Sequence, residues 1–70
     1  MKDSIGKTVF TVRADTNSID AWTLDSILTL PDGDRAVLKN SDGCTCILPI
    51  GCVFATREKA LEVANKNFFN

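Results

Sequence analysis

Three cysteines, Cys44, Cys46 and Cys52, are the residues whose type suggests metal or covalent chemistry. Three thiolates could begin a zinc site, but structural zinc usually has four Cys or His ligands. The chain has no histidine, no second cysteine pair and no fourth cysteine, so the sequence favours neither a zinc site within one chain nor one shared across a dimer. We therefore expect no metal and no cofactor, and interpret the cysteines as reduced thiols that fill space as small apolar side chains.

Catalysis by one of these thiols would need a base beside it, and histidine, the usual base, is missing. Glycines occur singly along the chain, so the sequence predicts no phosphate-binding loop. Paired carboxylates would have to come from aspartates near turns or on an outward strand face, where carboxylates are usually solvated. We expect no enzymatic activity and no catalytic residues.

The acidic residues are unevenly distributed. The segment 14–34 has five acids and no base, and the rest of the chain has eight bases and four acids. Aspartates commonly occupy turns and solvent-facing strand positions. The sharper alternative is an acidic face that docks on a basic partner. Because an aromatic residue near a chain end often docks on a partner as well, the candidate protein-binding residues are Asp15, Asp20, Asp25 and Phe69.

Length and composition limit the class of protein. Seventy residues make one domain, 1–70, with a thin core, and 44% apolar and 24% charged residues are typical of a globular chain. No apolar run approaches the roughly 18–20 residues that span a bilayer, and Met1–Ser4 has no apolar stretch behind it, so neither a membrane span nor a secretory signal is expected. We expect a cytoplasmic protein. A net charge of −1 disfavours nucleic acid as a partner.

Short strands followed by one helix would position these residues. Alternating patterns and turn signals predict strands between about 7 and 54. The segment 19–30 is interpreted as a strand with a bulge near Ser26, although a short helix also fits part of it. The expected extended segments are 7–13, 19–30, 35–40, 44–48 and 50–54, of which the last is a short fifth strand or an apolar connector.

The C-terminal segment predicts a helix over about 57–67. Thr56 is a good N-cap residue. Apolar residues at spacings of three and four form one stripe, with Val63 at its edge. We expect Trp22 to be the principal core side chain and Phe54 to anchor the strand-to-helix junction. The stripe consists of Ala60, Leu61, Ala64 and Phe68.

The predicted fold is therefore α+β and mainly β: a small antiparallel sheet or SH3-like barrel of four to five strands with one C-terminal helix. Four segments carry a resemblance: 7–12, 19–24, the Asp42–Gly43 hairpin and 53–60, which is similar to a strand-to-helix junction found after SH3-like strands. Through them the chain, from Lys7 to Ala64, resembles a recurrent type of small protein from Gram-positive bacteria and their phages. The resemblance implies a phage or mobile-element origin and carries over no site residue.

These observations predict a non-enzymatic interaction module that binds another protein. The resemblance and the small size suggest one alternative, a phage-encoded inhibitor of a bacterial defence complex. A nucleic-acid-binding SH3-like barrel is the other alternative, although the basic residues do not interleave with the aromatic ones. Because the core is thin, homodimerisation is a further expectation.

Overall fold

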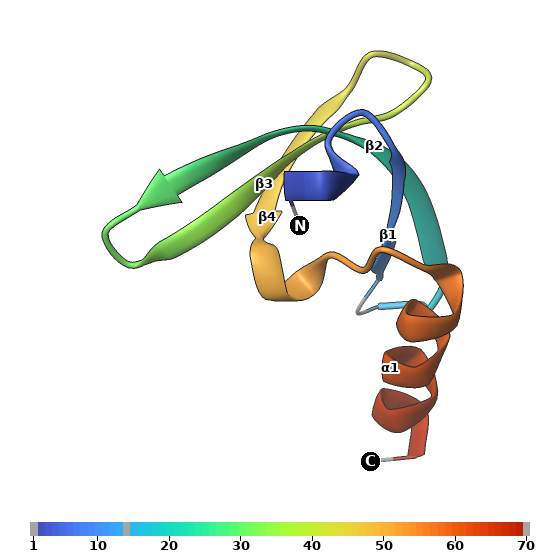
Figure 1. Cartoon of the computed structure of the whole chain (residues 1–70). Helices are drawn as coiled ribbons and strands as arrows, with labels where there is room; N and C mark the ends of the chain where they lie inside the picture. Colours follow the sequence, from blue (N-terminus) through green and yellow to red (C-terminus); the bar gives the residue numbers. More distant parts are fainter. Residues whose placement is uncertain (1, 14, 70) are drawn as a thin grey trace.

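The computed structural model describes the backbone of residues 2–13 and 15–69 and the side chains of residues 2–13 and 15–66. Four strands form one antiparallel sheet in the order β1-β2-β3-β4, and a single α-helix follows them (Figure 1). An antiparallel sheet with one C-terminal helix confirms the predicted fold class. The elements are η1 (Lys2–Ser4), β1 (Thr8–Val12), β2 (Ile19–Leu30), β3 (Gly33–Lys39), β4 (Thr45–Pro49), η2 (Ile50–Cys52) and α1 (Arg57–Phe69).

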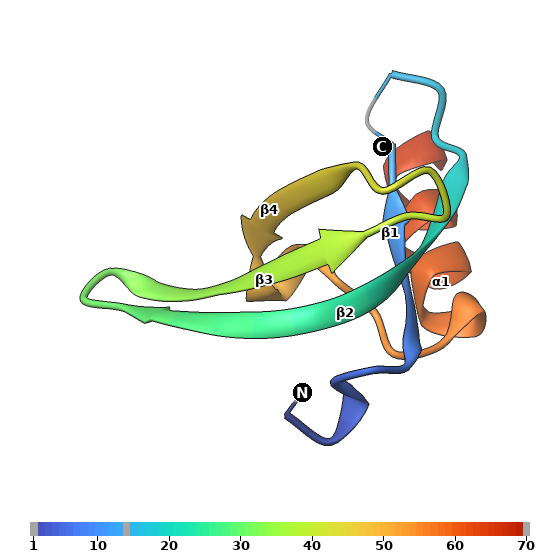
Figure 2. The same cartoon turned by 90° about the horizontal axis from the view of Figure 1, so that it is seen from above.

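The longest strand, β2, has two neighbours. Its first part, residues 19–23, pairs with β1, and residues 23–30 pair with β3. The register with β3 shifts between Leu24 and Ser26, which leaves Asp25 as an extra residue. The strand interpretation of 19–30 and the bulge near Ser26 are thus confirmed. A bulge increases the local twist and bends the strand, and β2 curves across the whole molecule (Figure 2).

Tight turns join β2, β3 and β4. Leu30 and Gly33 close a two-residue turn at Pro31–Asp32, and Gly33 has φ of 134°. This conformation is available mainly to glycine. In the next turn the Asn40 side chain has the organising role, because its Oδ1 accepts the N–H groups of Asp42 at 3.0 Å and Cys44 at 2.9 Å.

The predicted fifth strand is reduced to a single bridge. After β4 the chain tightens into the 3-10 turn η2, and Phe54 then pairs with Phe10 of β1. Their two backbone hydrogen bonds, Phe10 N–H to Phe54 O and the reverse, are both 2.8 Å long. Because η2 uses most of the connection, too few residues remain for a fifth strand. The sheet is therefore open, and the barrel alternative does not apply as a closed barrel.

The core lies on one face of the sheet. Val9, Leu24, Ala36, Leu38 and Val53 form one buried cluster. Trp22 packs against this cluster but is only half-buried, so the prediction that it is the principal core side chain is wrong. The physical reason is that an indole N–H needs a hydrogen-bond partner. Its Nε1 donates to Oγ1 of the buried Thr11 at 3.0 Å, which holds the ring at the rim of the core.

Helix α1 begins where the sequence predicts. The Thr56 Oγ1 accepts the Lys59 N–H at 3.2 Å, which confirms the N-cap. Ala60 and Ala64 are buried, but Leu61 is 39% exposed, so the predicted apolar stripe is wrong at Leu61. The side chain of Phe68 lies outside the described residues. The helix contacts β1 and β2 (Figure 1), and the Asn17 side chain donates a hydrogen bond to the Ala64 carbonyl.

The unequal burial of two leucines gives a stability prediction. Leu24→Ala should lower the free energy of unfolding by about 2–5 kcal/mol, because Leu24 is fully buried and the substitution leaves a cavity. Leu61→Ala deletes the same atoms at an exposed helix position and should change stability by less than about 1 kcal/mol. Chemical denaturation monitored by Trp22 fluorescence measures both. Equal losses for the two variants would contradict the assignment of the core.

Candidate protein-binding surface

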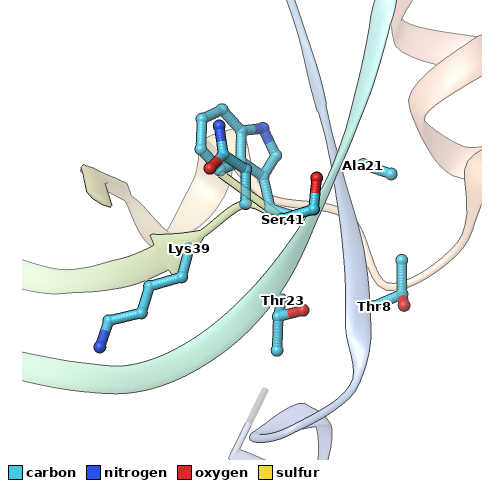
Figure 3. Close-up of a pocket in the computed structure, with 7 residues that line it drawn as sticks. Thr8, Ala21, Thr23, Lys39 and Ser41 are labelled. Carbon is cyan, nitrogen blue, oxygen red and sulfur yellow. The ribbon is translucent and has the colours of Figure 1, made fainter. Parts of the chain in front are cut away.

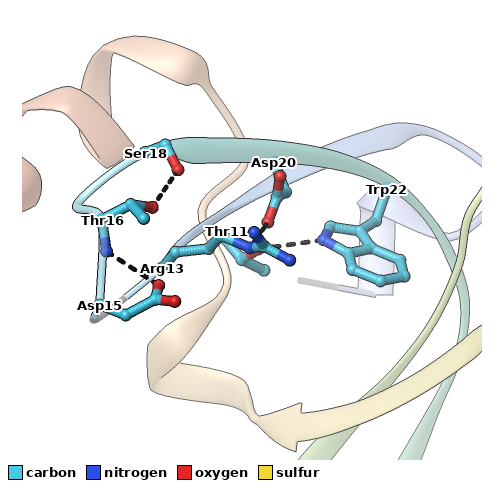
Figure 4. A network of polar contacts seen from close by, with 7 residues as sticks. All are labelled: Thr11, Arg13, Asp15, Thr16, Ser18, Asp20 and Trp22. Atoms are coloured by element: carbon cyan, nitrogen blue, oxygen red, sulfur yellow. Dashed lines mark hydrogen bonds and ion pairs between the residues drawn. The ribbon is translucent and has the colours of Figure 1, made fainter.

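The structure places each candidate aspartate beside a hydrogen-bond donor. Asp15 lies in the β1–β2 loop, and its Oδ1 accepts the Thr16 N–H at 2.8 Å (Figure 4). In the same network, Asp20 Oδ2 is 3.1 Å from Arg13 Nε. Asp25 Oδ1 is 3.7 Å from Lys39 Nζ. Both ion pairs are exposed, and such pairs typically contribute about 0–1 kcal/mol.

These aspartates do not form one face. Asp20 is the strand partner of Thr11 and lies on the side of the sheet that bears Trp22. Asp25 is the bulged residue and contacts Lys39, on the opposite side. The structure therefore does not bring Asp15, Asp20 and Asp25 together as an unpaired acidic surface. The remaining candidate, Phe69, ends α1, but its side chain lies outside the described residues.

The cysteines differ from one another in exposure. Cys46 is half-buried and packs against the core, as predicted. Cys44 and Cys52 are exposed, so the prediction that all three fill interior space is wrong for these two. Cys44 lies in the turn before β4, and Cys52 lies in η2. Among residues 2–13 and 15–66, no three Cys, Asp or Glu side chains are grouped as a metal site would require.

The depressions on the described surface include two shallow ones. Figure 3 shows the larger one, of about 280 Å³, which lies over β1, β2 and the β3–β4 turn. Short hydroxyl side chains line much of it, and Lys39 extends away from Thr8 and Ala21. Both depressions are below the roughly 300–1,000 Å³ of most small-molecule sites. The smaller one, of about 180 Å³, is lined by Val12, Gly51, Cys52, Phe54 and Val63.

A feature that the sequence analysis missed is the apolar outer face of the distal sheet. Leu28 and Leu30 of β2 are both 42% exposed, and Ile47 of β4 is 55% exposed. Leu28 pairs with Arg35, and Ile47 pairs with Val37. Because Arg35 and Val37 are two residues apart on β3, all these side chains lie on the face opposite the core.

The second feature is an edge of β2, which we call the free edge and define as Ser26–Leu30 on the side away from β3. The Asn40 N–H donates to Cys44 O at 3.1 Å, so it points toward β4 and away from β2. In an antiparallel ladder the direction alternates, so the odd-numbered residues of β3 bond to β2. Their β2 partners include Ser26, Leu28 and Leu30. The N–H and C=O groups of Ile27 and Thr29 therefore point away from β3.

Nothing in the described part of the chain pairs with these outward groups. The pairing of β1 with β2 ends at Thr8 and Thr23. The residues just before β1 extend the contact only to Leu24, whose N–H donates to Lys7 O at 3.0 Å and whose C=O accepts the Gly6 N–H at 2.8 Å. The sequence has one signal for this edge: residues 26–30, which lie between Asp25 and Pro31, carry no charge. What the sequence lacks is any indication of where β1 stops.

Comparisons of the chain with known protein families, with curated proteins and with solved structures find no match. Within the described residues, no helix is long and apolar enough to cross a membrane.

The exposure of the cysteines gives a prediction for thiol labelling. In the folded protein, Cys44 and Cys52 should react with a thiol reagent at rates close to those of the unfolded chain, because both are exposed. Cys46 should react more slowly until denaturant is added, because it packs against the core. Mass spectrometry of peptides from a time course of labelling distinguishes the sites. Fast labelling of Cys46 together with the other two would contradict this arrangement.

Proposed function

We propose that this protein is a non-enzymatic interaction module that binds another protein through the free edge of β2. The observation that carries the proposal is the free edge itself, together with the two exposed leucines beside it. A partner in extended conformation would add a strand to the sheet there. Main-chain hydrogen bonds to Ile27 and Thr29 would supply affinity, and contacts with alternate side chains would supply specificity.

Physical chemistry makes such an edge a template for pairing. Proteins usually protect exposed edge strands with charged residues, proline, bulges or very short length. In this protein only the two ends of the free edge carry such protective residues: the bulged Asp25 precedes it and Pro31 follows it. The five residues between them are uncharged, and three are large and aliphatic. This composition favours association over solvation.

The shape of the molecule supports the same proposal. The β2–β3 hairpin projects from the rest of the chain as an arm in both views (Figures 1 and 2). Strand β4 reaches β3 only as far as the Arg35–Pro49 pair, so the tip of the arm is two-stranded. A two-stranded hairpin is marginally stable in water without a third strand or a packed face. A bound strand would supply the third strand.

The proposal assigns the aspartates of β2 to surface ion pairs and not to catalysis. The aspartates of β2 are exposed to solvent or half-buried and are paired with Arg13 or Lys39. Exposed carboxylates that pair with a neighbouring base are typical of surface ion pairs. We accordingly assign no catalytic residue.

A pair of lysine substitutions tests the proposed surface. Peptides selected by display against the immobilised protein should bind as extended apolar segments and perturb the amide resonances of Ile27 and Thr29. For a selected peptide, Leu28→Lys should raise the Kd at least about tenfold, because it places a charge on apolar contact surface. Leu61→Lys, a matched exposed leucine on α1 and outside this surface, should leave the Kd within about twofold. Equal binding by wild type and Leu28→Lys would contradict the assignment.

A further inference from the structure

We infer that the partner which fits the free edge is a second copy of this chain, related by a twofold axis that passes beside Leu28. This inference rests on the proposed binding role of the free edge and specifies its occupant. It is argued from three properties of residues 26–30: the direction of the backbone groups, the side chains on the outer face and the distribution of charge.

The backbone directions select one register. In an antiparallel pair, residues with outward groups must lie opposite residues with outward groups. With Leu28 opposite Leu28, Ile27 of each copy faces Thr29 of the other, and these two pairs form four hydrogen bonds. The symmetric register centred on Ile27 or on Thr29 forms only one such pair. In those registers the next outward residue meets either Asp25, at the bulge, or Pro31, which has no N–H.

The side chains agree with the same register. Leu28 would occupy a non-hydrogen-bonded pair, where opposite Cα atoms lie about 4.5 Å apart and side chains are closest. The two Leu28 side chains, each 42% exposed in one chain, would then pack on each other on the outer face. Ile5 is 47% exposed and lies at the start of the free edge, because the Gly6 N–H donates to Leu24 O. It adds apolar surface at each end of the interface.

The charges permit this pairing of identical segments. An edge that carried charge would meet the same charge in a second copy, but residues 26–30 carry none. Asp25 of one copy would face Pro31 of the other. The acids that flank the edge are already paired within their own chain, Asp25 with Lys39 at 3.7 Å and Asp32 with Arg35 at 2.9 Å. The two copies would thus form one continuous eight-stranded sheet without opposed unpaired charges.

The overlap of five residues is short, so the expected dimer is weak and concentration-dependent. Small interfaces, below about 1,200 Å² in total, are typical of transient complexes. Sedimentation velocity over a concentration series should show a monomer–dimer equilibrium for the wild type. Thr29→Pro removes an outward N–H and no bond within the chain, and it should shift the equilibrium at least tenfold toward monomer. Leu61→Lys, on α1 and away from both the edge and the outer face, should dimerise as the wild type does.

Cysteine cross-linking tests the register, and it does not depend on whether Thr29→Pro folds. In a chain that carries Cys44→Ser, Cys46→Ala and Cys52→Ser, Leu28→Cys should form a disulfide-linked dimer under a mild oxidant, since the two Cα atoms are within bridging range. Leu30→Cys is the matched control. In this register two residues 30 lie four strand positions apart, about 13 Å, so Leu30→Cys should remain monomeric on a non-reducing gel.

The outcomes separate this inference from the proposed function. A wild type that stays monomeric at all concentrations, with equal cross-linking of the two cysteine variants, would overturn the second copy as occupant. In that case the loss of peptide binding in Leu28→Lys would still uphold the protein-binding role. If neither dimer nor peptide binding depends on Leu28, both are overturned. Cross-linking of Leu30→Cys in preference to Leu28→Cys would overturn the twofold axis at Leu28.

Discussion

The sheet depends on the backbone of Leu24, the point at which β2 changes its number of partners. The Leu24 N–H and C=O bond to Lys7 and Gly6 on the β1 side, while its side chain is fully buried in the core. The next residue, Asp25, is the extra residue of the bulge. From there β2 continues with β3 alone. One residue thereby joins the part of β2 that has two neighbouring strands to the part that has one.

This change of partner explains why the two halves of the sheet differ in chemistry. Around Leu24, β1 pairs with β2, and Val53 after η2 completes the buried cluster. Beyond Asp25, β2 pairs with β3 alone among the described residues, and Leu28 and Leu30 are exposed. A chain of 70 residues buries a smaller fraction of its surface than a larger domain does, so few of its residues are available to cover a second apolar face. The uncovered edge and leucines are therefore where a partner gains most, by pairing main-chain groups and removing apolar surface from water.

The charged residues have a different role from the one that their clustering in the sequence suggests. Three of the five clustered aspartates pair with bases that lie elsewhere in the chain: Asp20 with Arg13, Asp25 with Lys39 and Asp32 with Arg35. The five negative charges of segment 14–34 are thus partly balanced by positive charges that lie beside them in the folded chain. Because these pairs are exposed, they add little to stability. Two of the pairs, Asp25 with Lys39 and Asp32 with Arg35, place charge on either side of the free edge and not within it.

Local signals in the sequence determined the elements of this protein. The turn at Pro31–Asp32, the cap at Thr56 and the break in alternation near Ser26 act over a few residues, and the structure has a turn, a helix start and a bulge at those places. The sequence also contains the uncharged stretch 26–30, but it does not indicate that this stretch forms a free strand edge. Only the tertiary structure decided that Trp22 lies at the rim of the core and that Leu28 is exposed. The physical reason is that burial and hydrogen-bond pairing depend on which strand lies opposite and where it stops, and neither is encoded in the local pattern.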